Sequence, residues 1–140
     1  MRKTLSRLGG AAAVALLLAT GCSTSQPAGG TSVQVSERDF HVSAPASVPA
    51  GDVQLAVSNR GPEAHELIVV RAHGSSLPLR ADGLTVNEEA LDPVVAGTLE
   101  PGDPGSRRGL QVHLVPGRYE LFCNMSGHYL GGMHTDLVVR

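Results

Sequence analysis

A chain of 140 residues is long enough for one folded domain and too short for two of ordinary size. Its 11 basic residues do not outnumber its 13 acidic ones, so the chain lacks the positive surface that neutralises nucleic-acid phosphates. Aromatic residues make up only 3% of the sequence, so the core has to be built from Val, Leu and Ile, which favour strands.

Residues 1–22 are predicted to be a secretory signal peptide. Arg2, Lys3 and Arg7 form its positive start, and a short apolar run over residues 11–19 follows. This run is too short and wrongly flanked for a stable transmembrane helix. Since three of the eleven basic residues lie in this segment, the exported part has eight basic against thirteen acidic residues, a net charge of −5. Such a surface permits soluble partners with basic docking faces.

Cys22 directly follows the small residues 19–21, as in the cleavage site of bacterial lipoproteins. The match is imperfect, because the usual Leu three residues before the cysteine is Ala19 here, with Leu18 one place further away. We expect a lipid on Cys22 to anchor the exported protein to a membrane, on the outer face of the cytoplasmic membrane or in the periplasm. Ordinary secretion with cleavage nearby is the alternative.

Residues 23–32 are uncharged and rich in Ser, Thr, Gly, Pro and Ala, which predicts a flexible linker. The folded domain is expected over residues 33–140. Its apolar segments are short, alternate as half-buried strands do, and are separated by Gly and Pro. The predicted strands cover residues 33–37, 53–57, 65–70, 110–114, 118–123 and 133–139. Many short strands with turns between them favour an all-β sandwich or barrel.

Residues 73–105 are the least regular stretch of the predicted domain. A short helical turn is expected over residues 84–91, and several Pro and Gly residues interrupt the segment that follows. The sequence predicts no role for this insertion. Residues 45–51, with two prolines and a glycine, are predicted to be a turn.

The residues that carry chemistry gather near the C-terminus. Cys123, His128 and Met133 follow one another as Cys-x4-His-x4-Met, and His65 lies upstream at the head of an apolar strand. Two His and one Cys in a plane, with a weak axial Met, are the ligands of a blue-copper electron-transfer site. Cys123 has no partner once Cys22 is lipidated, and an unpaired thiol in an oxidising compartment is a liability unless a metal occupies it.

The strand periodicity explains how these ligands could meet. Alternation places Cys123 on the inward face at the end of one core strand, and His65 at the start of another. The loop 124–132 contains three glycines and returns at Met133, so it could hold His128 at its middle against the same pole. Thiolate and thioether are soft ligands that favour copper, whereas structural zinc normally takes four strong ligands, and Met is a weak one.

The domain as a whole resembles the cupredoxins, the family of small blue (type 1) copper proteins. The resemblance is carried by Tyr-Glu-Leu-Phe-Cys at residues 119–123, then Gly127-His128 and Gly132-Met133, and its spacing is closest to the rusticyanin and sulfocyanin branch. It implies a Greek-key β-sandwich with one type 1 copper ion at one end. The implied ligands are His65, Cys123, His128 and Met133. It also implies that His128 is partly exposed and serves as the exit for the electron.

Other polar residues near the motif have less specific interpretations. Glu66 departs from the family, which commonly has Asn or Ser there, and strand parity turns it away from the metal. Asn59 and Asn124 are alternative donors around the site. His134 is expected on the surface beside the site, and Met125 is expected to pack against it. The remaining histidines, His41, His73 and His113, are expected in loops or on the surface, and Glu88-Glu89 on a solvated face.

The sequence thus predicts an exported electron carrier that is not an enzyme, with redox proteins as partners. A copper-binding or copper-delivery protein of the cell envelope, which exchanges copper with donors and acceptors, uses the same residues and is the main alternative. A small copper or zinc enzyme would need an open metal position, which Met133 is expected to fill. A metal-free adhesion module is the fourth hypothesis.

Overall fold

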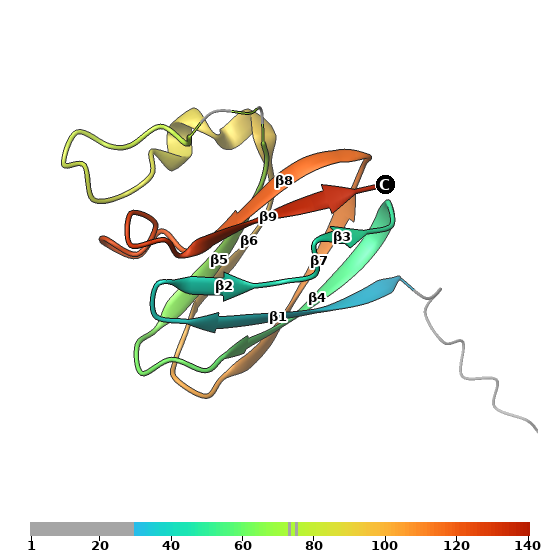
Figure 1. Cartoon of the computed structure of the whole chain (residues 1–140), viewed down its shortest axis with the longest axis horizontal. Coiled ribbons are helices and arrows are strands. Elements are labelled where there is room, and N and C mark those ends of the chain that lie inside the picture. Colours follow the sequence, from blue (N-terminus) through green and yellow to red (C-terminus); the bar gives the residue numbers. More distant parts are fainter. Residues whose placement is uncertain (1–29, 73, 75) are drawn as a thin grey trace, which may run out of the picture.

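The computed structural model describes residues 30–72, 74 and 76–140. The predicted signal peptide with Cys22, the linker up to residue 29, and His73 lie outside the described residues, so the predictions made for them remain predictions. Nearly all regular structure in the described part is β (Figure 1). Within it, no helix is both long and apolar enough to span a membrane.

Two sheets stack face to face (Figure 1). The first has the strand order β2-β1-β4-β7 and the second β3-β9-β8-β5-β6. The pairs β1–β4 and β3–β9 are parallel, and the other neighbours are antiparallel. The strands are β1 (Thr31–Arg38), β2 (His41–Ser43), β3 (Ser47–Val48), β4 (Gly51–Asn59), β5 (His65–Arg71), β6 (Val95–Gly102), β7 (Arg107–Leu114), β8 (Gly117–Phe122) and β9 (His134–Val139). The predicted β-sandwich is confirmed.

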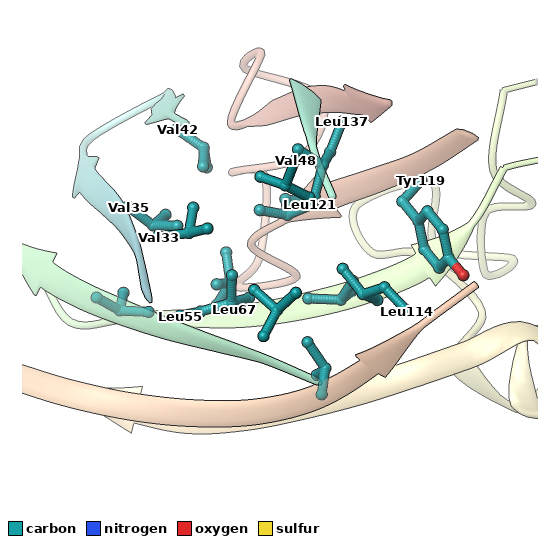
Figure 2. Close-up of a cluster of buried hydrophobic side chains, with 14 of the residues drawn as sticks. Val33, Val35, Val42, Val48, Leu55, Leu67, Leu114, Tyr119, Leu121 and Leu137 are labelled. Atoms are coloured by element: carbon teal, nitrogen blue, oxygen red, sulfur yellow. The ribbon is translucent and has the colours of Figure 1, made fainter. Parts of the chain in front are cut away.

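The main core lies between the sheets and is made almost wholly of aliphatic side chains (Figure 2). In β4 the alternation places Val53, Leu55 and Val57 inside, and in β8 it places Tyr119 and Leu121 inside. These are the positions that the two-residue period of the sequence predicts. Cys123 and Met133 belong to the same cluster, so the end of this core is also the place where the predicted ligands gather.

Strands β5 and β8 are buried on both faces. Their outer face carries Ile68, Val70 and Phe122, which form a second cluster with Val86 and Leu91 from the segment between β5 and β6. In Figure 1 this segment, with its short 3-10 turns η1 (Glu88–Ala90) and η2 (Asp92–Val94), lies at the same end of the sandwich as the loop between β8 and β9. The insertion therefore covers apolar surface that the sheet would otherwise expose.

The structure differs from the predicted elements in several places. β1 begins at Thr31, inside the predicted linker, because Thr31 pairs with Val53 of β4. The turn predicted over 45–51 contains the short strand β3. The helical turn predicted over 84–91 is present only as the 3-10 turn η1 at Glu88–Ala90, and a second such turn, η2, follows it. β6 was not predicted, because its Pro101 argues against a strand. The structure accommodates Pro101 because β6 lies at the edge of the second sheet.

Candidate metal centre

Two neighbouring strands bring His65 and Cys123 together. β5 and β8 are antiparallel with Ile68 opposite Phe122, so the start of β5 lies beside the end of β8. Both side chains are fully buried. The backbone N–H of Glu66 also donates to the sulfur of Cys123, and so does the backbone N–H of Met125. The sulfur is thereby held between the strand that carries His65 and the loop that carries His128.

The loop between β8 and β9 is closed on itself by its backbone. The N–H of Cys123 donates to the carbonyl of Met133 over 3.1 Å, and the N–H of Met133 donates to the carbonyl of His128 over 3.0 Å. Gly127 and Gly132 take positive φ angles of 79° and 99°, which side chains other than glycine rarely adopt. These turns direct His128 back over the end of the core.

His65, Cys123 and His128 form a compact group of possible metal ligands. One ligand atom from each residue lies within 4.8 Å of the other two. The Sγ atom of Cys123 is 3.6 Å from Nδ1 of His128, and the two imidazole centroids are 5.2 Å apart. Met133 is fully buried in the same core cluster as Cys123. Its place as the axial ligand remains a prediction.

The hydrogen bonds leave the inner nitrogen of His65 free. Nε2 of His65 is 3.1 Å from Oδ1 of Asp39, whereas Nδ1 is buried and has no hydrogen-bond partner among the described residues. Buried polar atoms are almost always paired, so an unpaired nitrogen beside a thiol and a second imidazole fits a metal ligand. Two imidazoles and a buried sulfur suit copper.

Burial favours the neutral forms of the ionisable side chains in and beside this group, and so shifts their pKa values. The pKa of the Cys123 thiol is raised to about 11, because burial outweighs the hydrogen bonds from the amides of Met125 and Glu66. The pKa of His65 is lowered by burial and by the nearby His128, and Asp39 opposes this shift. Burial and then Glu88 raise the pKa of Glu66. A cation that binds here would therefore displace the thiol proton.

The expected exposure of His128 is wrong. His128 is buried, because the ring of Phe40 packs edge-on against it with centroids 5.4 Å apart, and because its Nε2 lies 3.0 Å from Oε2 of Glu63. Phe40 is itself exposed and has a positive φ of 60°. The turn between β1 and β2 thus covers the histidine that loop position alone would leave open.

Sequence reasoning missed Asp39, Phe40 and Glu63. Asp39 and Phe40 lie in the turn between β1 and β2, and Glu63 lies in the loop between β4 and β5. No motif or alternation includes them, so only the folded arrangement could reveal their contacts with the histidines. For Glu63 the only signal in the sequence is that it is a charged residue two positions before His65.

Asn59 and Asn124 act on the loops around the site. The side chain of Asn59 donates to the carbonyl of Glu63 over 2.7 Å and accepts from the N–H of Gly61 over 2.9 Å. Asn124 binds both the N–H and the carbonyl of Val86, so it ties the insertion to the loop after β8. Its backbone N–H donates to the carboxylate of Glu66. Glu66 is half-buried between the buried residues His65 and Leu67, as strand parity predicts.

The other singled-out residues lie largely where they were expected. His41, His113 and His134 are exposed, and His134 pairs with Glu120 on the outer face of the second sheet. Met125 packs against the main core. Glu88 differs from the expectation of a simple solvated residue, because its carboxylate accepts from the side chain of Asn124 over 2.6 Å.

Comparison with known proteins reveals likeness in structure but not in sequence. No protein-family model matches the chain, and no curated protein matches it. Reduced auracyanin from Roseiflexus castenholzii matches with a TM-score of 0.61 and 19% identity over 80% of this chain and 99% of auracyanin. Auracyanin A, a "blue" copper protein from Chloroflexus aurantiacus, matches with a TM-score of 0.60 and 16% identity, over 80% of this chain and 100% of auracyanin A. Rusticyanin from Thiobacillus ferrooxidans matches with a TM-score of 0.59 and 15% identity, over 80% of this chain and 79% of rusticyanin.

These likenesses show that the chain has the cupredoxin fold, as the sequence resemblance predicted. The identities are low, so the fold is the conclusion they carry. The chain combines that fold with a buried His-Cys-His group suited to copper.

Proposed function

We propose that this chain is an exported blue copper protein that carries single electrons between redox partners. The observation that carries the proposal is the buried group of His65, Cys123 and His128, whose ligand atoms lie within 4.8 Å of one another. The unpaired Nδ1 of His65 supports it further. The predicted axial ligand, Met133, completes the ligand set of a type 1 copper site.

The protein's part in this function is to hold the ligands still and to exclude water. The two strands fix His65 and Cys123, and the backbone bonds of the loop fix His128. All three side chains are buried, so solvent has little access to the group. Copper bound there would supply a one-electron couple between Cu(II) and Cu(I). A rigid, dry site changes little on electron transfer, which favours fast exchange of electrons.

The same burial favours an electron carrier over a copper-delivery protein or an enzyme. A delivery protein has to pass its metal to an acceptor, which requires access to the ligands. A catalytic metal needs an open position for water or substrate. Here the sandwich, Phe40 and Glu63 surround the group. Nevertheless, copper delivery uses the same ligands, and exchange of the metal distinguishes the two functions.

The proposed location and partners rest on the sequence alone. The signal peptide over residues 1–22 and the lipid on Cys22 would place the domain outside the cytoplasm on a membrane. The net charge of −5 of the exported part favours redox proteins with a basic docking face. A Cys22→Ser variant should leave the membrane fraction, and it should keep its copper site.

The test is to load the purified exported domain with Cu(II) and record its absorption spectrum. A Cu–thiolate bond gives an intense blue colour that disappears on reduction and returns on oxidation. Cys123→Ser should abolish the colour. Loss of more than about 100-fold in Cu(I) affinity is expected, since even partners of the ligands contribute 10- to 100-fold.

Exchange with a chelator then separates the carrier from the delivery protein. A carrier keeps its copper through repeated cycles of reduction and oxidation in the presence of a competing chelator. Rapid loss of copper to the chelator would favour copper delivery. A copper-loaded, oxidised protein without colour would refute the type 1 site itself.

A further inference from the structure

The outer nitrogens of both candidate histidine ligands face carboxylates. Nε2 of His65 is 3.1 Å from Oδ1 of Asp39, and Nε2 of His128 is 3.0 Å from Oε2 of Glu63. The carboxylates come from two different loops, one between β1 and β2 and one between β4 and β5. Each imidazole is thus held between the ligand group on one side and a negative charge on the other.

The surrounding residues are shaped to maintain these pairs. A Cβ atom on Gly61 would lie 2.6 Å from Oδ1 of Asp39 and 2.8 Å from Nε2 of His65, so any side chain there would disturb the pair. Asn59 is buried and holds the backbone at both Gly61 and Glu63. Both carboxylates therefore belong to a built arrangement around the histidines.

Such pairs have two physical effects. An Nε2–H that donates to a carboxylate fixes the tautomer in which Nδ1 carries the free lone pair, which is the atom that faces the cysteine sulfur in His128. The negative charge also makes the imidazole a stronger donor and lies close to the bound cation. The first effect presents the lone pair to a metal in either oxidation state, whereas the second favours the more highly charged state.

The geometry points to Asp39 and Glu63 as paired positioning residues that stabilise Cu(II) over Cu(I) at the ligand group and so lower its reduction potential. This inference rests on the proposed copper function. The two residues should not contribute equally. The His65–Asp39 pair has side-chain exposures of 0% and 27%, whereas the His128–Glu63 pair has 9% and 59%. Solvent and salt screen the second pair more, so Asp39 should have the larger effect.

The test is a redox titration of the copper-loaded exported domain and of the variants Asp39→Asn and Glu63→Gln. Asp39→Asn should raise the ratio of Cu(I) to Cu(II) affinity about tenfold, which is an upward shift of about 59 mV for one electron. Glu63→Gln should raise it by a smaller factor, and that shift should shrink at high salt. The absorption and electron paramagnetic resonance spectra should remain those of a type 1 site.

A matched control is available at an exposed pair. Nδ1 of His113 is 2.7 Å from Oδ1 of Asp52, with side-chain exposures of 68% and 85%, at the end of β4 away from Asn59. Asp52→Asn makes the same chemical change and should alter the affinity ratio less than twofold. Glu63→Asp, which keeps the charge, should retain most of the wild-type potential.

The outcomes separate this inference from the proposed function. If the wild-type protein forms no blue copper site, both fail. If the wild type is blue and both neutral variants keep its potential, or lower it, the inference is overturned while the electron carrier stands. Because Glu63 is largely exposed, Glu63→Gln should fold even if Asp39→Asn does not, and an unchanged potential at both low and high salt in that variant would alone overturn the role of Glu63.

Discussion

At the scale of single residues, Met133 offers the clearest test of the predicted ligand set. It is fully buried in the core cluster that contains Cys123. Replacement of Met133 by Leu nearly conserves volume and should cost less than about 1.5 kcal/mol of stability. The blue colour should persist, and the reduction potential should rise, because removal of a donor atom disfavours Cu(II) more than Cu(I). A redox titration measures this shift.

Met125→Leu is the matched control for that substitution. Met125 packs against the same core and keeps its backbone hydrogen bond to the cysteine sulfur when its side chain changes. The reduction potential of the Met125→Leu variant should equal that of the wild type. Equal shifts in the two variants, or none in Met133→Leu, would contradict an axial role for Met133.

The residue scale also shows what the sequence could predict about the site. Cys123, His128 and Met133 have ligand chemistry at a fixed spacing, and strand parity places His65 on the correct face. Asp39 and Glu63 have neither a spacing nor a periodic pattern. Their positions depend on how two separate loops fold over the same pole, which single-sequence reasoning does not resolve.

At the scale of elements, the turn between β1 and β2 is fitted to the loop between β8 and β9. A Cβ atom on Gly131 would overlap the ring of Phe40, the residue that covers His128. Gly131→Ala should therefore push Phe40 away and destabilise the fold by about 1–3 kcal/mol, as overpacking does. Urea unfolding of the copper-free protein measures the free energy of unfolding.

Gly109→Ala serves as the control for this effect. The atom nearest to a Cβ there is the terminal amide nitrogen of Gln54, at the end of a flexible side chain that can move aside. This variant should lose little stability. If Gly131→Ala proves as stable as Gly109→Ala, the fit between Phe40 and the loop contributes nothing.

Elements were predicted well where the alternation of side chains was strong, as in β4 and β8. β6 escaped prediction because Gly97, Pro101 and Gly102 interrupt its pattern. In the structure Pro101 fits because it lies on an edge strand. Gly97 fits because a Cβ atom there would lie only 2.7 Å from the side chain of Val112, so the packing leaves no room for a larger residue. Long-range packing decides such cases, and no local pattern reports it.

At the scale of the whole molecule, a buried ion pair crosses the first sheet. Glu37 of β1 is fully buried, and its Oε2 lies 2.7 Å from Arg108 of β7, with β4 between the two strands. The other carboxylate oxygen of Glu37 has no hydrogen-bond partner among the described residues. Burial raises the pKa of Glu37 to about 7, although Arg108 opposes the shift.

This pKa shift predicts how stability depends on pH. Between the unfolded value of 4.5 and about 7, the folded protein binds more protons at Glu37 than the unfolded chain does. The share of Glu37 in the free energy of unfolding should therefore fall as pH rises through this window, by about 3 kcal/mol at most. Glu66 and Glu120 also have raised pKa values and contribute with the same sign, whereas the lowered pKa of His65 contributes with the opposite sign below its unfolded value of 6.5. Chemical unfolding of the copper-free protein from pH 4.5 to 8 measures the slope.

Glu37→Gln should flatten this slope, although the shares of Glu66 and Glu120 remain. Glu89→Gln is the control, because the side chain of Glu89 is largely exposed and pairs only loosely with Arg80 at 3.5 Å. It should leave the slope unchanged. A slope that is the same in Glu37→Gln and in the wild type would show that Glu37 does not titrate in this range.

A crystal structure of the Cu(II)-loaded exported domain, with anomalous diffraction at the copper edge, tests the central claim most directly. We predict a single peak within bonding distance of Nδ1 of His65, Sγ of Cys123 and Nδ1 of His128. A peak elsewhere on the molecule, or copper bound through Nε2 of either histidine, would contradict the site proposed here.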